Sequence, residues 1–183
     1  MKINVFKQLV LCVAILAGTA SFAQTKMVGG AKMYPSKNIV ENAVNSKDHT
    51  TLVAAVKQAG LVKTLQGDGP FTVFAPTNEF FEKLPKGTVK KVMMDKNKKT
   101  LQKVLKYHVV SGKITAKDLM KAIKKNDGKY SFKTVSGGML TAMMKDGNVM
   151  LKDKAGNMAK VTIADVMQSN GVIHVVDAVL MPK

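Results

Sequence analysis

Pairs of turn-forming residues divide the second half of the chain into short runs. The pairs are Asp127-Gly128, Gly137-Gly138, Asp146-Gly147, Gly156-Asn157 and Asn170-Gly171. Asp, Asn and Gly adopt the backbone conformations that tight turns require, so short runs between such pairs are typical of strands. We therefore predict strands over residues 130–135, 139–145, 148–152, 159–164 and 172–180.

The first half of the chain has a helical pattern instead. Apolar residues recur at helical spacing between Asp48 and Gly60 and again from Leu101 to His108, which places His108 on an apolar stripe. Thr115, with an acidic residue three positions later, resembles the capping box that opens a helix. Helices thus come mainly first and strands mainly later, without steady alternation. This order favours an α+β domain over a doubly wound fold.

The first 23 residues have the layout of a secretory signal peptide. Lys2 and Lys7 are followed by an apolar stretch from Leu9 to Ala17 and by small residues ending at Ala23. The apolar stretch is shorter than the roughly 20 residues that a membrane helix needs, and no later segment comes closer. We therefore expect residues 1–23 to be removed and the mature chain, without a transmembrane segment, to be exported to the periplasm, the cell surface or the medium.

The mature chain is expected to contain one domain. Residues 24–35 have no clear period and are interpreted as an N-terminal arm, with order beginning near Ser36 and a single domain over residues 36–183. Removing 23 of the 183 residues leaves 160, enough to bury roughly 70% of the unfolded chain's surface. Cys12, the one cysteine, lies within the predicted signal peptide, so neither a disulfide nor thiol chemistry is expected in the mature chain.

All 29 basic residues are lysine, and the formal net charge is +17. The planar group that grips phosphate or carboxylate at two points belongs to arginine, whereas lysine is a strongly hydrated point charge. We therefore expect no sequence-specific binding of nucleic acid. A lysine-rich surface holds acidic polymers non-specifically, with an attraction that weakens as salt rises. The alternative is that the lysines only keep an exported protein soluble.

The chain offers little material for catalysis. Its histidines, His49, His108 and His174, are scattered singly, and the common nucleophile, zinc and phosphate-loop motifs do not occur. Metal sites usually gather several His, Cys or carboxylate ligands. We therefore expect no catalytic residue, metal site or cofactor. His108 and His174 are interpreted as neutral core residues that form hydrogen bonds, and Tyr107 as a packed ring with a bonded hydroxyl.

Three segments resemble the characteristic motifs of the fasciclin domain family in order and separation. They are "FTVFAPTNEFFEKLP" (71–85), "YHVV" (107–110) and "SNGVIHVVDAVLMP" (169–182). The first segment is interpreted as a strand that ends at Pro76 and is followed by a short helix. The last is interpreted as a turn that leads into a central strand. The resemblance implies a wedge-shaped β-sandwich with helices packed alongside, which agrees with the α+β class.

The resemblance also implies adhesion and names two contact segments. In animal members, binding is ascribed to the Tyr-His segment and to an acidic motif shortly before the final strand. This sequence adds an aromatic residue in the short helix, where the family usually has a small one. The candidate contact residues are therefore Phe80, Tyr107, His108, Asp165, Val166 and Met167.

Several functions remain open at this point. The first is a non-catalytic adhesion or interaction module at the cell surface or in the extracellular matrix, which binds an envelope or matrix protein or a polysaccharide. The second is a lysine-rich electrostatic binder of acidic envelope or extracellular polysaccharide, whose affinity falls steeply with salt. An enzyme is motivated only by the histidines. The sequence leaves open the oligomeric state, and whether an apolar pocket lies between the sandwich and the helices.

Overall fold

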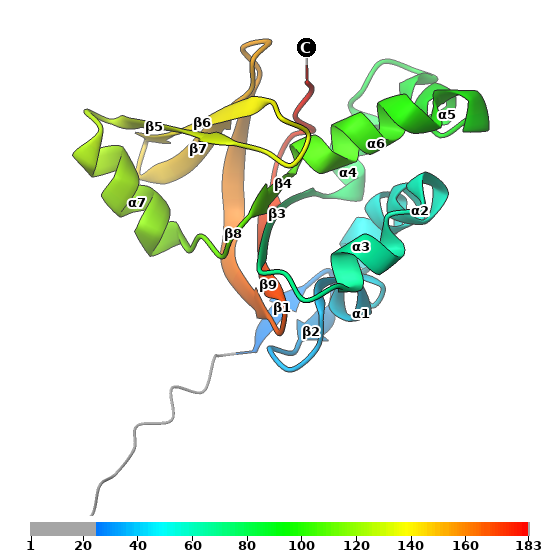
Figure 1. Ribbon diagram of the computed structural model, residues 1–183, viewed down its shortest axis with the longest axis horizontal. Coiled ribbons are helices and arrows are strands. Elements are labelled where there is room, and N and C mark those ends of the chain that lie inside the picture. Colours follow the sequence, from blue (N-terminus) through cyan, green and yellow to red (C-terminus); the bar gives the residue numbers. More distant parts are fainter. Residues whose placement is uncertain (1–24, 183) are drawn as a thin grey trace, which may run out of the picture.

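The computed structural model describes residues 25–182, whose strands form a bent seven-stranded sheet and a separate two-stranded hairpin (Figure 1). The order in the large sheet is β4-β3-β9-β8-β7-β6-β5. The predicted signal peptide, residues 1–23, lies outside the described residues. The strands are β1 (Lys26–Val28), β2 (Ala31–Met33), β3 (Phe71–Pro76), β4 (Val109–Ser111), β5 (Lys129–Lys133), β6 (Met139–Lys145), β7 (Asn148–Lys152), β8 (Met158–Gln168) and β9 (Gly171–Val176).

Most of the helices precede the strands of the second half, as the sequence pattern predicted. The helices are α1 (Ile39–Ala43), α2 (Thr50–Ala59), α3 (Val62–Gln66), α4 (Asn78–Glu82), α5 (Thr88–Val92), α6 (Lys98–Tyr107) and α7 (Ala116–Lys125), with short 3-10 turns at Lys47–His49 and Asp95–Asn97. Two predicted helix signals are confirmed. Gly60 ends α2 in the left-handed conformation, with φ of 71°. Thr115 opens α7 with a capping box that includes Asp118.

The long strand β8 joins the two halves of the sheet. It pairs with β7 over residues 158–160 and with β9 over residues 161–168, and its register shifts twice between Val161 and Val166. Such irregularities bend a strand. The single strand β8 therefore passes from one half of the sheet into the other. Figure 1 shows β8 running between β5–β7 and the strands β9 and β3, with the helices alongside. The predicted α+β sandwich is therefore confirmed.

The central strands β3 and β9 separate two hydrophobic cores. They are parallel, and every residue of β9 is buried. Because side chains alternate along a strand, Val73 and Ile173 face a first core and Phe74 and Val176 face a second. The first core lies among α1, α2, α3, α6 and the β1–β2 hairpin. The second lies between α7 and the strands β5–β8.

The β1–β2 hairpin corrects the expectation that residues 24–35 are an arm outside the ordered domain. Val28 and Met33 are both buried in the first core. The turn of the hairpin is held by a hydrogen bond from the backbone N–H of Lys47 to the carbonyl of Gly29, at 3.0 Å. Ordered structure therefore begins before Ser36, and the hairpin forms part of the wall of the first core.

Candidate functional site

Tyr107 and His108, at the end of α6, lie in the interior of the protein. The hydroxyl of Tyr107 donates a hydrogen bond to the carbonyl of Met139 at 2.7 Å and accepts one from the backbone N–H of Lys154 at 3.2 Å. Burial raises the pKa of Tyr107. The side chain therefore ties α6 to β6 and to the loop after β7.

His108 connects α6 to the C-terminal segment. Its Nε2 accepts the backbone N–H of Leu180 at 3.0 Å, so Nδ1 carries the proton and donates to the carbonyl of Val104 at 2.9 Å. Burial lowers the pKa of His108, which favours this neutral form. Both ring nitrogens are thus used within the core, as expected for a packing residue.

Asp165, Val166 and Met167 lie in the bent part of β8. Asp165 adopts the left-handed conformation, with φ of 55°, and its Oδ1 accepts the backbone N–H of Ala116 at 2.8 Å. Its own backbone N–H donates to Nδ1 of His174 at 3.3 Å. Val166 is buried in the first core, whereas Met167 is half-buried. The carboxylate of Asp165 therefore holds the start of α7 against β8.

Phe80 lies in α4 and is half-buried. The ammonium of Lys83 lies 4.2 Å from the centre of the Phe80 ring, within the range of a cation–π contact. Lys83 also forms an ion pair with Glu79 at 2.6 Å. The sequence candidates thus have three separate surroundings: the end of α6, the bend of β8 and the short helix α4.

The described residues offer neither a metal cluster nor a membrane helix. Within residues 25–182, no group of three or more His, Cys, Asp or Glu side chains is placed to hold a metal ion. In the same range, none of the helices combines the length and apolar character required to cross a bilayer.

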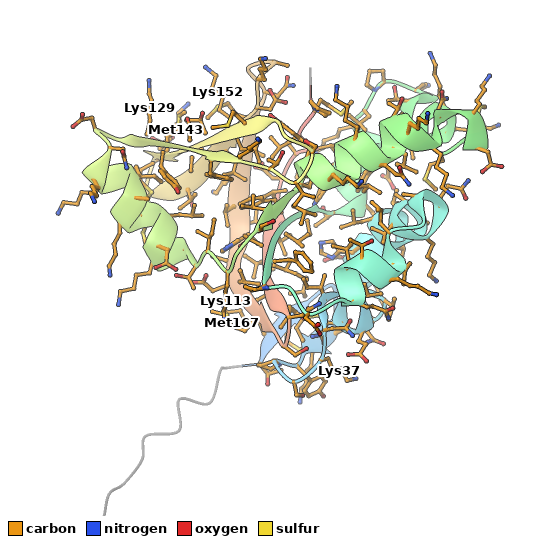
Figure 2. All side chains as sticks on the ribbon, viewed as in Figure 1. Lys37, Lys113, Lys129, Met143, Lys152 and Met167 are labelled. Carbon is orange, nitrogen blue, oxygen red and sulfur yellow. The ribbon has the colours of Figure 1, made fainter. Side chains whose placement is uncertain are left out.

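One face of the sheet formed by β5, β6, β7 and the start of β8 is open to solvent. The other face packs against α7 in the second core, through buried residues such as Phe132, Leu140 and Leu151. Figure 2 shows Lys129, Met143 and Lys152 on the side away from α7. We call this surface the lysine–methionine face. It is defined by Lys129, Lys133, Lys145, Lys152, Lys160, Met139, Met143, Met150 and Met158.

The strand register intersperses lysine with methionine on this face. Lys129 lies opposite Met143, which lies opposite Met150, which in turn lies opposite Lys160. In no registered pair do two lysines stand directly opposite each other, an arrangement that would be destabilising. In residues 129–133, 139–145, 148–152 and 158–160 no aspartate or glutamate occurs. The face therefore presents a positive charge that no carboxylate on these strands neutralises.

The lysine–methionine face was missed by reasoning from the sequence. Its signal is the alternation in "KYSFK" and "NVMLK", in which every second residue shares a face. The alternation predicts that the lysines of each strand lie on the side opposite its buried residues. It does not show which strands are neighbours or which side α7 covers, and both were needed to recognise the surface.

Comparison with known proteins identifies the family. The fasciclin domain pattern matches residues 47–182. Protein sll1483 of Synechocystis sp. is 45% identical over 159 residues, which cover 87% of this chain and 81% of that protein. The transforming growth factor-beta-induced protein ig-h3 of Sus scrofa is 35% identical over 153 residues, which cover 81% of this chain but 20% of that protein. The chain therefore belongs to the fasciclin domain family.

A solved structure has the same fold. The domain pair of fasciclin I, described as an insect cell adhesion molecule, superposes with a TM-score of 0.71 at 20% sequence identity. The match covers 79% of this chain and 51% of that chain. At this identity the likeness establishes the fold, and the adhesion role belongs to fasciclin I itself.

Proposed function

We propose that this protein is a non-catalytic interaction module that acts outside the cytoplasm and binds acidic polysaccharide through the lysine–methionine face. The observation that carries the proposal is the uncovered sheet face, on which the strand register gathers lysines without a carboxylate. Export is supported by the pattern of residues 1–23, and an adhesion role by membership of a family that includes a cell adhesion molecule.

The geometry of a sheet suits an extended, charged partner. Neighbouring strands lie about 4.8 Å apart, and residues two apart on one strand lie about 7 Å apart. The ammonium groups therefore form a shallow two-dimensional array rather than a pocket. Such an array attracts a chain of carboxylates or sulfates along its length, and salt screens the attraction because both partners remain in water.

Methionine gives the same face an adaptable apolar component. Met139 is 45% exposed, and Met143, Met150 and Met158 are half-buried between the lysines. Their flexible thioether side chains follow irregular surfaces, including the apolar faces of sugar rings. Lysine lacks the planar fork that specifies one geometry, so this surface is suited to recognise a class of acidic polymers rather than a single sequence of sugars.

The test compares two variants that lose the same charge. In the face variant, Lys129, Lys133 and Lys152 are changed to glutamine; in the control, Lys63, Lys99 and Lys124, which are exposed on α3, α6 and α7, are changed in the same way. Binding of residues 24–183 to polygalacturonate and to neutral dextran is measured by calorimetry over 50–300 mM NaCl, because the affinity of ionic contacts falls linearly with salt on logarithmic axes.

The proposal predicts an asymmetric result. The face variant should bind polygalacturonate at least tenfold more weakly and lose about two to three units of salt slope, since each ionic contact contributes about one. The control should lose less than threefold. Equal losses in both variants would show that the lysines act only through net charge, and equal binding of dextran would show that charge is not what is recognised. Either result overturns the proposal.

A further inference from the structure

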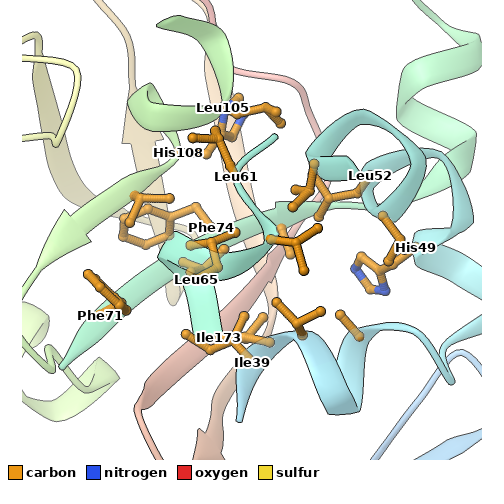
Figure 3. Close-up of a pocket in the computed structure, with 18 of the residues that line it drawn as sticks. Ile39, His49, Leu52, Leu61, Leu65, Phe71, Phe74, Leu105, His108 and Ile173 are labelled. Atoms are coloured by element: carbon orange, nitrogen blue, oxygen red, sulfur yellow. The ribbon is translucent and has the colours of Figure 1, made fainter. Parts of the chain in front are cut away.

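The first core contains a cavity of about 100 Å³ (Figure 3). It lies where α1, α2 and α3 meet the central strands, and the buried hairpin residues Val28 and Met33 form part of its wall. The lining is almost entirely hydrocarbon, and it includes Ile39, Leu52, Leu61, Leu65, Phe71 and Ile173.

A cavity of this size is large for a protein interior. Cores are packed as densely as organic crystals, and voids larger than a water molecule are few. An apolar cavity of about 150 Å³ stays dry and holds a molecule such as benzene. Water is poorly suited to this cavity, because an ordered water needs two to four polar partners. The cavity is therefore suited to a compact apolar molecule.

One polar atom in the wall lacks a partner. His49 is 4% exposed, and its Nδ1 lies 2.9 Å from the hydroxyl oxygen of Ser46. Its Nε2 is buried and forms no hydrogen bond; among the side chains of residues 25–182 it is the one such buried nitrogen or oxygen. Figure 3 shows the His49 ring beside the apolar side chains of the cavity. An unpaired buried group of this kind costs about 1–3 kcal/mol.

The ring is neutral, so Nε2 either donates or accepts. Burial lowers the pKa of His49, and the smaller effects of the Ala75 backbone and of the Asp48 charge, which raise it, do not reverse this direction. The Ala75 backbone is close enough to the ring to affect its pKa, but it does not meet the geometry of a hydrogen bond to Nε2. The hydroxyl of Ser46 serves Nδ1 as donor or as acceptor, so either neutral form of the ring is available. A ligand hydroxyl complements both forms, because it also donates and accepts. A carboxylate would bring an ion into hydrocarbon, which is far more costly.

We propose that this cavity binds a compact apolar molecule with a single hydroxyl group, such as a phenol or a cyclic alcohol of about six carbon atoms, whose hydroxyl forms a hydrogen bond with Nε2 of His49. The site is distinct from the lysine–methionine face, which lies on the outer surface of β5–β8. A negative result for one of the two proposals therefore does not affect the other.

The first experiment separates the hydrogen bond from the cavity. Phenol and benzene differ by one hydroxyl group, and the binding of each to residues 24–183 is followed by NMR chemical shifts. In the variant Ser46→Ala/His49→Leu, both polar partners are replaced by apolar side chains. The ratio of phenol affinity to benzene affinity should fall about tenfold, as expected for the loss of one hydrogen bond. An unchanged ratio would remove His49 from the site.

A second pair of variants locates the bound molecule. Ala43 lines the cavity, and Ala43→Leu should fill it and abolish the binding of both molecules. Ala122→Leu makes the same change on α7, outside the cavity lining, and should leave binding unaltered. Thermal unfolding of each variant shows that it is folded. If Ala43→Leu retains full phenol binding, or if the unmodified protein binds neither molecule, the proposal is wrong.

Discussion

The two cores on either side of β3 and β9 differ in how completely they are packed. In the second core, the ring of Phe74 stacks on His174, with ring centroids 5.6 Å apart, and contacts Phe132 at 5.9 Å. Leu140, Leu151 and Leu119 have no exposed surface. The first core instead contains a cavity and the unpaired nitrogen of His49.

The difference follows from the elements that build each core. The second core is bounded by strands in continuous ladders, which fix their spacing and the direction of every side chain. The first core is bounded by α2 and α6, with ten residues each, and by several short elements: α1 and α3 have five residues each, and β1 and β2 have three. Short helices and strands bring few side chains to an interface, so gaps remain where their ends meet. A ligand cavity is therefore expected on the helical side of this fold rather than on the strand side.

The largest expected effect is a loss of packing in the second core. Leu151→Ala should lower the free energy of unfolding by about 3–5 kcal/mol, because Leu151 is fully buried among closely packed neighbours. Leu65→Ala, at the wall of the cavity, should cost about 2 kcal/mol, because the side chain already lacks neighbours on one side. Urea unfolding of both variants makes the comparison. Equal losses would show that the cavity does not loosen the first core.

The hairpin that closes the first core should be sensitive at one glycine and tolerant at the next. A Cβ atom at Gly29 would lie 2.3 Å from Oγ of Ser46 and 2.6 Å from the backbone N of Asp48, whereas nothing lies within 4 Å of a Cβ atom at Gly30. Both residues have positive φ, so each alanine variant carries a strain of about 1 kcal/mol.

Only Gly29→Ala adds a steric clash, which should raise its total cost to about 2–4 kcal/mol. Thermal unfolding compares the two variants. A similar melting temperature for both would mean that the hairpin moves freely away from Ser46, and that it does not form a firm wall of the cavity.

Stability should fall as the solution becomes acidic. Burial lowers the pKa values of His49, His108 and His174 below the value of 6.5 expected in the unfolded chain. Below pH 6.5 the unfolded chain therefore binds protons that the folded protein does not, and the free energy of unfolding decreases as the pH falls. Between pH 7.5 and 5.5 the loss should reach at most about 1.4 kcal/mol for each histidine.

The measurement is the urea midpoint as a function of pH. His108→Asn should remove about one third of the slope while it also lowers stability at neutral pH, because the N–H of Leu180 loses its acceptor. A pH profile that is identical with and without His108 would mean that this ring already titrates normally in the folded protein.

The sequence predicted the helices and strands best where local signals, such as turn pairs, mark their ends. The bounds predicted for β6 and β7 agree with the structure, because turn pairs flank both strands. The strand predicted over residues 159–164 extends to Gln168, since β8 continues through its irregular register. The hairpin of β1 and β2 was missed because each strand has three residues and only one of them is buried, Val28 or Met33. One buried residue in each strand is too few to show an alternation in the sequence.

The candidate sites were less predictable, for a physical reason. The buried position of His108 follows from its helical spacing, and that of Tyr107 was predicted from its aromatic ring and bonded hydroxyl. The lysine–methionine face depends on the pairing of four strands, and the cavity depends on how short helices fail to fill a volume. Both are properties of distant segments brought together, so no local pattern records them.

The smallest expected effect is that of replacing the buried histidine of the first core, and it is compared with the same replacement in the second core. His174→Leu should cost about 2–3 kcal/mol, because the N–H of Asp165 and the carbonyl of Ile114 both lose their partner. Ser46→Ala/His49→Leu should change the free energy of unfolding by less than about 1 kcal/mol, because it removes a mutual hydrogen bond together with an unpaired nitrogen. Urea unfolding at pH 7.5 keeps both rings neutral. A loss in the double variant as large as that of His174→Leu would mean that Nε2 of His49 is already paired, and that the cavity lacks the polar group its ligand requires.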